Sequence, residues 1–161
     1  MSIKKLLPLS GVWVGKGLAE YPTIEKAEYS EELVFQANEL FPVIHYEQKT
    51  WVKSEDGLFT KPIFWESGFI IEKENALLEL CNVQKGGRME ILSGIIKEDP
   101  NTGFEIVFES VNIFNDEKTV RSGRKFIFYE NTLKYELYMS TKKNFSFDLH
   151  LRANLSKQAS K

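Results

Sequence analysis

The sequence predicts an all-β fold, an antiparallel up-and-down barrel of about ten strands. Apolar and polar residues alternate with a period of two in one segment after another, which is typical of half-buried strands. Aromatic residues make up 13% of the 161 residues and, together with β-branched residues, favour strands. No stretch longer than a few residues has the apolar period of a helix, and no repeat or linker divides the chain. We therefore expect residues 1–161 to form a single domain.

The expected elements follow one another with tight connections. Ile3 to Leu7 is expected to form one short turn before Pro8. Strands are then expected at residues 10–18, 27–36, 42–52, 63–72, 76–82, 88–97, 103–110, 118–129, 132–140 and 145–155. Turn compositions separate them at residues 55–57, 85–87, 99–103, 115–116 and 130–131. Only Ser156 to Lys161 is expected to be a frayed polar tail.

The alternation is clearest in the last two segments. The first of them places on one face Leu133, Tyr135, Leu137 and Met139. The second does the same with Phe145, Phe147, Leu149, Leu151, Ala153 and Leu155. Ten closed strands enclose a wider interior than the eight-stranded size at which side chains just fill a barrel. We therefore expect space for a ligand inside.

Composition and charge exclude several classes of partner. The net charge is −2 with mixed signs, so the chain lacks the basic patch that nucleic acid requires. Cys81 is the only cysteine, which rules out an intrachain disulfide and a thiolate metal cluster, and we expect it to be a small buried hydrophobe. No apolar run approaches the ~20 residues of a membrane span, and Met1 to Leu9 lacks a signal core. We expect a cytoplasmic protein with no membrane partner.

The motifs of several enzyme classes are also missing. The sequence has no Gly-x-Ser-x-Gly elbow and no phosphate-binding P-loop. His45 alternates in step with Glu47 and Lys49, so we expect it to face water. It is far in sequence from His150, the second histidine, and no carboxylates cluster around either, so a zinc site is not expected.

The most informative stretch is Gly11-Val12-Trp13-Val14-Gly15-Lys16-Gly17. A strand tolerates this much glycine only where backbone or ligand must come close. The tryptophan is large enough to plug one end of a barrel, while its indole N–H still needs a partner there. The glycine spacing does not fit a dinucleotide-binding fingerprint, and no helix follows.

This Gly-x-Trp-x-Gly-x-Gly motif resembles the signature of the nitrobindin family of heme proteins. Further blocks follow in the family's order, namely Tyr21-Pro22-Thr23-Ile24, Tyr46-Glu47-Gln48-Lys49-Thr50-Trp51, Glu66-Ser67-Gly68-Phe69 and His150-Leu151-Arg152-Ala153. The resemblance implies a ten-stranded, fatty-acid-binding-protein-like barrel that holds heme b in a cleft, with a histidine of the last strand as iron ligand. It also implies isomerisation of peroxynitrite to nitrate and binding of nitric oxide. A homodimer stays open.

His150 is the residue to which this resemblance assigns the iron. An imidazole on a rigid strand can ligate heme iron and leave the opposite face open. Alternation alone, however, groups His150 with the polar positions of its strand, opposite Leu149 and Leu151. The preceding loop, residues 141–144, is also about one residue longer than is usual in the family. A β-bulge would change the facing of this strand.

Four further residues are candidates for the heme pocket. Some family members carry a histidine on the open side of the heme, where this sequence has Phe64, which can pack on a porphyrin but cannot exchange protons. The resemblance suggests Lys118 as a contact to a heme propionate, and Arg124 would suit a bidentate pair better. Thr50 is a weaker candidate to line the cleft.

A second function stays open beside the heme protein. The same barrel would suit a non-enzymatic carrier of an apolar ligand, in which His150 is incidental. Cations beside an accessible His150 would favour heme, whereas a closed and uniformly apolar cavity would favour the carrier.

Overall fold

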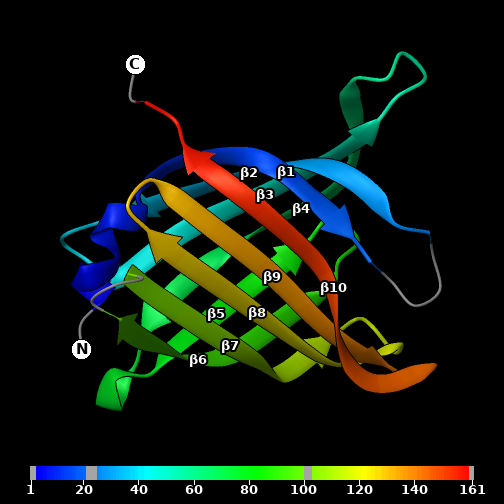
Figure 1. Ribbon diagram of the computed structural model, residues 1–161. Helices are drawn as coiled ribbons and strands as arrows, with labels where there is room; N and C mark the ends of the chain where they lie inside the picture. The colour runs from blue at the N-terminus through cyan, green and yellow to red at the C-terminus, as the bar shows by residue number, and fades with distance from the viewer. Residues whose placement is uncertain (1–2, 21–24, 100–102, 160–161) are drawn as a thin grey trace.

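In the computed structural model, which describes residues 3–20, 25–99 and 103–159, ten antiparallel strands close into a barrel (Figure 1). Each strand pairs with its neighbours in sequence, and the first pairs with the last, as the predicted up-and-down topology requires. The strands are β1 (Gly11–Ala19), β2 (Ala27–Ala37), β3 (Val43–Lys53), β4 (Phe59–Glu72), β5 (Leu78–Gln84), β6 (Met89–Asp99), β7 (Gly103–Phe114), β8 (Thr119–Tyr129), β9 (Thr132–Thr141) and β10 (Asn144–Lys157). The block at 21–24 and most of the turn at 99–103 lie outside the described residues.

Several boundaries differ from the predicted ones. β5 begins later because a short 3₁₀ turn, η2 (Glu74–Ala76), precedes it, and Asn75 there has a left-handed φ of 59°. β4 and β7 are longer than expected. The predicted frayed tail is wrong at its start, since β10 continues to Lys157. The Lys157 N–H donates to the Asn131 carbonyl at 3.0 Å, and the Gln158 N–H donates to the Val12 carbonyl at 2.8 Å.

The glycines of β1 are needed for close approach, as the motif predicted. A Cβ on Gly15 would lie 2.0 Å from the Asn154 carbonyl oxygen of β10. A Cβ on Gly17 would lie 2.2 Å from the ring of Tyr29 on β2. These two positions let β10 pair tightly with β1 and let the Tyr29 ring lie over the β1 backbone.

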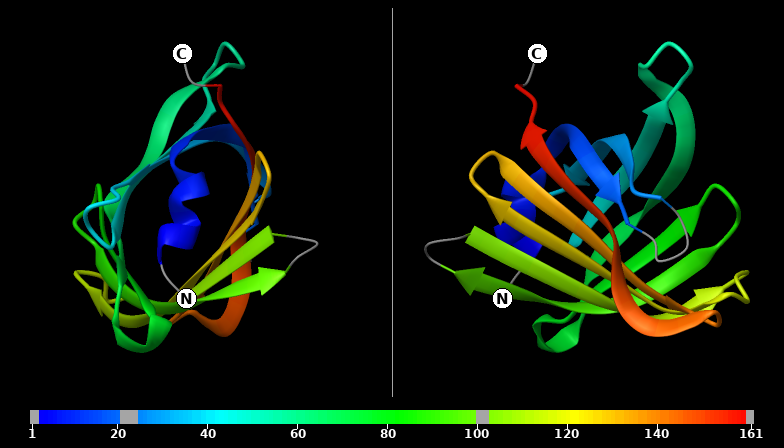
Figure 2. Two further views of the ribbon diagram at one scale, coloured as in Figure 1. Left: turned by 90° about the vertical axis from the view of Figure 1, so that its left-hand side faces the viewer. Right: turned by 45° about the vertical axis from the view of Figure 1, so that its right-hand side comes forward.

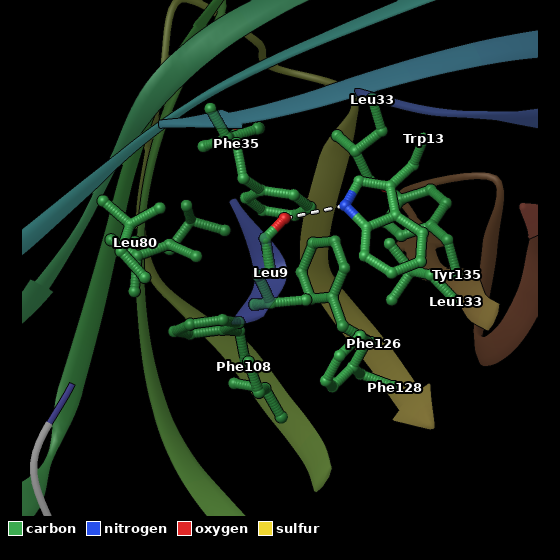
Figure 3. Packing of buried hydrophobic residues seen from close by; sticks show 14 of the residues in the cluster. Leu9, Trp13, Leu33, Phe35, Leu80, Phe108, Phe126, Phe128, Leu133 and Tyr135 are labelled. Carbon is green, nitrogen blue, oxygen red and sulfur yellow. Dashed lines mark hydrogen bonds between the residues drawn. The ribbon is translucent and has the colours of Figure 1, made fainter. Parts of the chain in front are cut away.

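A 3₁₀ helix closes one end of the barrel. The predicted short turn is in fact η1 (Ile3–Leu9), which includes Pro8 and buries Ile3, Leu6 and Leu9. Figure 2 shows this helix inside the barrel opening. Trp13 beside it is fully buried, as predicted, and its indole Nε1 donates to the Leu9 carbonyl at 2.7 Å (Figure 3). The helix and the tryptophan together form the plug.

The apolar core fills this plugged end. Inward-facing residues of β2, β5, β7, β8 and β9 form this core together with Trp13, whose ring meets Phe128 edge-on at 5.4 Å between centroids. Phe126 meets Phe35 and Phe108 in the same edge-to-face manner (Figure 3). Burying aromatic rings in this geometry stabilises a core beyond the area that they remove from water.

The prediction for Cys81 is wrong. Its side chain is half-buried rather than buried, and its thiol lies 3.7 Å from a carboxylate oxygen of Glu79. The inward positions of β5 are taken by Leu78, Leu80 and Asn82, so alternation places Cys81 on the outer face.

Within the described ranges, no helix is long and apolar enough to cross a membrane.

Candidate functional site

A cavity of about 710 Å³ lies inside the barrel at the end away from η1. Its walls are mainly apolar, and side chains of β1, β2, β3, β4, β5, β8, β9 and β10 line it. Among the predicted site residues, His150, Phe64, Lys118 and Arg124 all line it. Thr50 is buried on the inner face of β3 opposite Phe64 of β4 and is not among the residues that line the cavity, so its contact with a cofactor stays a prediction.

A β-bulge brings His150 to the cavity. From its C-terminal end back to Leu151, which lies opposite Leu137, β10 pairs regularly with β9. The next pair toward the start of β10 is Leu149 opposite Tyr138. His150 is therefore the extra residue between these two pairs, and the facing of the strand changes there. His150 and its neighbour Leu151 consequently both line the cavity, although strict alternation would separate them.

The environment of His150 favours a neutral imidazole. Its side chain is only 5% exposed, and burial lowers its pKa from the usual value, although the Asp148 carboxylate acts in the opposite direction. A neutral ring keeps a nitrogen lone pair, which a metal ligand needs. The main-chain carbonyl of His150 accepts a hydrogen bond from the Glu20 N–H at 2.8 Å, which fixes the backbone at the bulge.

Phe64 faces the same cavity from another wall. It lies on β4, which is separated from β10 by β1, β2 and β3 around the barrel, and it pairs with Thr50 across β3 and β4. Its phenyl ring makes this wall apolar where a histidine would make it polar. His45 lies outside the cavity, on the outer face of β3, where its ring nitrogen is 2.8 Å from the Ser67 hydroxyl.

Arg124 is bound into a buried polar network at the floor of the cavity. Its Nη2 donates to Glu66 at 3.1 Å and to Glu90 at 2.6 Å, and its Nη1 donates to the Tyr135 hydroxyl at 2.7 Å. The Tyr46 hydroxyl donates to the second oxygen of Glu66 at 2.9 Å. Arg124 therefore already has two carboxylate partners, and an incoming carboxylate is better served by Lys118.

The two carboxylates of this network differ in their pKa. Burial raises the pKa of Glu66, despite the attraction of Arg124. Burial also opposes the charge of Glu90, but the guanidinium groups of Arg124 and Arg88 outweigh it and hold its pKa far below the usual range. Ser122 adds a hydrogen bond to Glu90 at 2.7 Å. Glu90 thus stays ionised and holds Arg124 and Arg88 in place.

A third buried carboxyl belongs to Glu31 on β2. Burial raises its pKa to about 7, against hydrogen bonds from Gln48 and Tyr29 that favour the charged form. The Gln48 amide donates to it at 2.8 Å. Glu31, Glu66 and Glu90 were not predicted from the sequence as site residues. Each occupies an inward position in the alternation of its strand, which is a usable signal.

Comparison with known proteins identifies the family of this chain. The sequence model of one family, described as the THAP4-like, heme-binding β-barrel domain, matches residues 2–157. The chain belongs to this family. The THAP4-like assignment agrees with the nitrobindin resemblance seen in the sequence motifs, and related proteins carry the name ferric nitrobindin-like protein.

Relatives within the THAP4-like family extend over nearly the whole chain. A protein of Arabidopsis thaliana named peroxynitrite isomerase Rv2717c is 35% identical over 92% of this chain and 84% of its own length. Peroxynitrite isomerase 2 of Mycobacterium ulcerans is 31% identical over 96% of this chain and 93% of its own. The crystal structure of Rv2717c from M. tuberculosis superposes with a TM-score of 0.84 at 27% identity, covering 98% of this chain and 97% of that one.

The donor set of the cavity fits the cofactor of this THAP4-like family. It offers one buried, neutral imidazole at a bulge, apolar walls from Leu137, Met139 and Leu151, and cationic side chains at its edge. A flat apolar macrocycle with an iron centre and peripheral carboxylates has the complementary features.

Proposed function

We propose that this protein binds heme b through His150, isomerises peroxynitrite to nitrate, and binds nitric oxide. The observation that carries the proposal is the β10 bulge, which turns the imidazole into an apolar cavity edged by cations. The names of the Arabidopsis and mycobacterial relatives support the same activity.

The residues of the cavity have distinct roles in this proposal. Bound heme supplies an iron that acts as a Lewis acid toward an oxygen of the substrate. His150 would hold the iron through its neutral ring, and the apolar walls would exclude water from the cavity. Lys118 pairs with a carboxylate of the porphyrin at the edge. Phe64 has no proton to exchange, so the protein provides no acid–base help from this wall.

The carrier of an apolar ligand is the second candidate. The apolar walls favour it, because they would suit an acyl chain or another hydrophobic ligand. Against it, the same cavity places a buried histidine and several cations around its lining, which an apolar ligand does not use.

An absorption titration tests the ligand assignment. Hemin is added to the purified parent, to His150→Ala, and to His45→Ala, which removes the histidine outside the cavity. We expect a shifted Soret band with one equivalent of hemin in the parent and in His45→Ala, and loss of that spectrum in His150→Ala. An unchanged spectrum in His150→Ala rejects His150 as the ligand.

Stopped-flow kinetics separates the enzyme from the carrier. Decay of peroxynitrite is followed with the heme-loaded parent, Phe64→His and free heme. We expect the parent to be faster than free heme and Phe64→His to change the rate, because general acid–base help typically contributes ~10²–10⁴-fold where present. A histidine at this position can instead ligate the iron, which the spectrum detects. A parent no faster than free heme and a silent Phe64→His reject the isomerase and favour the carrier.

We also propose that residues 1–161 form one domain, since pairing of β1 with β10 joins both ends of the described chain in one barrel. Limited proteolysis that leaves one resistant core would support it. A homodimer stays a prediction, for which light scattering is the measurement.

A further inference from the structure

Three lysines at the mouth of the cavity have no acidic partner among the described residues. Lys118, Lys142 and Lys143 line the cavity and are exposed. In the part of the chain that the structure describes, none of them lies within 4.0 Å of a carboxylate oxygen. Many other cations do, for example Lys125, which pairs with Glu105 at 3.0 Å.

The fold holds these lysines together from two neighbouring turns. The turn between β9 and β10 carries Lys142 and Lys143, and the turn between β7 and β8 carries Lys118. The Lys142 N–H donates to the Lys118 carbonyl at 2.9 Å, which ties the two turns to each other. The side chain of Asp116 accepts from the Lys118 N–H at 2.8 Å and so fixes the second turn. We call Lys118, Lys142 and Lys143 the lysine rim.

Two acids close in sequence to the lysine rim, Asp116 and Asp148, are already engaged, and the exposed Glu117 beside Lys118 does not line the cavity. Asp116 accepts hydrogen bonds from Thr119 and pairs with Arg88 at 3.3 Å. Asp148 accepts from the Asn144 amide at 3.1 Å. No Asp or Glu is among the described residues that line the cavity, although the chain as a whole carries a net charge of −2. The positive charge at the mouth is therefore a local feature. It lies against apolar walls, which have a low dielectric constant.

We propose that the lysine rim recruits anions and sets the ligand class of the cavity, so that anionic ligands enter in preference to neutral ligands of the same shape. Charges of one sign around a cavity with apolar walls focus the field and raise the local concentration of the opposite ion. The inference deepens the proposed function, because it makes the substrate class a small anion. It also applies to the cavity before any heme is bound.

Two dyes that share an aromatic core test the lysine rim on the heme-free protein. 1-Anilinonaphthalene-8-sulfonate carries one negative charge, and N-phenyl-1-naphthylamine is neutral, and both fluoresce in apolar cavities. The test variant is Lys118→Gln/Lys142→Gln/Lys143→Gln. The matched control is Lys4→Gln/Lys97→Gln/Lys134→Gln, which removes the same charge around the η1 end. Loss of binding of both dyes in Leu137→Trp, whose larger side chain fills the cavity, shows that they occupy it.

We expect the test variant to bind the sulfonate about tenfold more weakly at low ionic strength, since each exposed charge pair contributes modestly. The neutral dye should bind the parent, the test variant and the control equally, and salt should reduce the difference. Equal losses for both dyes, or equal losses in the two variants, would overturn the proposal, as would sulfonate binding that Leu137→Trp leaves unchanged. Iron ligation plays no part in this measurement, so its failure is distinct from failure of the isomerase activity.

Discussion

The two ends of the barrel use the same strands for different purposes. β8 contributes Phe126 and Phe128 at the plugged end but Ser122 and Arg124 toward the cavity. β10 likewise contributes Leu155 to the core and His150 to the cavity. In these two strands, the inward-facing side chains change from aromatic or aliphatic at the plugged end to polar at the cavity. Apolar burial at the plugged end stabilises the fold. At the open end, buried polar and charged side chains oppose stability but line the binding site.

The boundary between the two ends is the buried network around Arg124. Its carboxylate partners, Glu66 and Glu90, come from β4 and β6, and Tyr46 and Tyr135 complete it from β3 and β9. A buried charge is tolerated only when its partners are well placed. The network therefore links four strands besides β8 at the floor of the cavity, and it separates the apolar core from the site.

Truncation of the plug should have the largest effect on stability. Trp13→Ala leaves a void beside η1 and removes the partner of the Leu9 carbonyl, so we expect a loss of about 3–5 kcal/mol. Denaturant unfolding of the heme-free protein measures it. Trp51→Ala is the control for loss of an indole outside the core. A loss below about 1 kcal/mol would show that the end is not sealed by Trp13.

Breaking the network at the boundary should come next. Arg124→Met keeps a long side chain but leaves Glu66 and Glu90 without their shared partner, so we expect a loss of about 3–4 kcal/mol near neutral pH. Because protonation relieves the uncompensated charge, the loss should shrink in acid. Arg121→Met, on an exposed pair with Glu109, is the control. A loss that does not vary with pH would argue that packing, not charge, explains the effect.

Glu31→Gln should stabilise the protein, and only at higher pH. The pKa of Glu31 is about 7 in the fold and 4.5 in the unfolded chain, so the fold binds more protons between these values. The free energy of unfolding therefore falls as pH rises through this window. Gln keeps the contact with Gln48 without the charge.

We expect Glu31→Gln to gain on the order of 2–3 kcal/mol at pH 8 and almost nothing at pH 4. Glu32→Gln, the next residue on the strand and on its outer face, is the control. A gain of equal size at both pH values would contradict the assignment of the raised pKa to Glu31.

The smallest effect on stability is expected at the site itself. His150→Ala removes a ring that borders a cavity, so we expect a change within about 1 kcal/mol in the heme-free protein. Chemical denaturation of parent and variant, both without hemin, is the measurement. A loss as large as that of Trp13→Ala would mean that the open end also contributes to the core, and that the two ends are not divided as described.

The sequence predicted the barrel well because period-two alternation and turn residues are local signals. Ten strands, the role of Trp13 and the need for glycine in β1 all follow from such patterns. Features that depend on contacts between residues far apart in the sequence were harder to predict. The 3₁₀ helix η1 runs through Pro8 because the barrel end buries its apolar side chains, which no local pattern records.

The sequence placed several candidate residues at the cavity, but it did not predict the contacts that the buried polar residues make with one another. Motif resemblance identified His150, Phe64 and Lys118, and all three line the cavity. The facing of His150 depends on the register between β9 and β10, which alternation within one strand cannot give. Arg124 was expected to meet an incoming carboxylate, but its partners come from strands far apart in sequence.

The seam between β1 and β10 has a consequence for biosynthesis. The first strand can complete its hydrogen bonds only when the tenth has been made, so the nascent chain exposes an open sheet throughout most of its translation. His150 lies on that tenth strand, so the closed cavity and its histidine become available together. A cofactor held by His150 could therefore be bound only after the tenth strand has been synthesised.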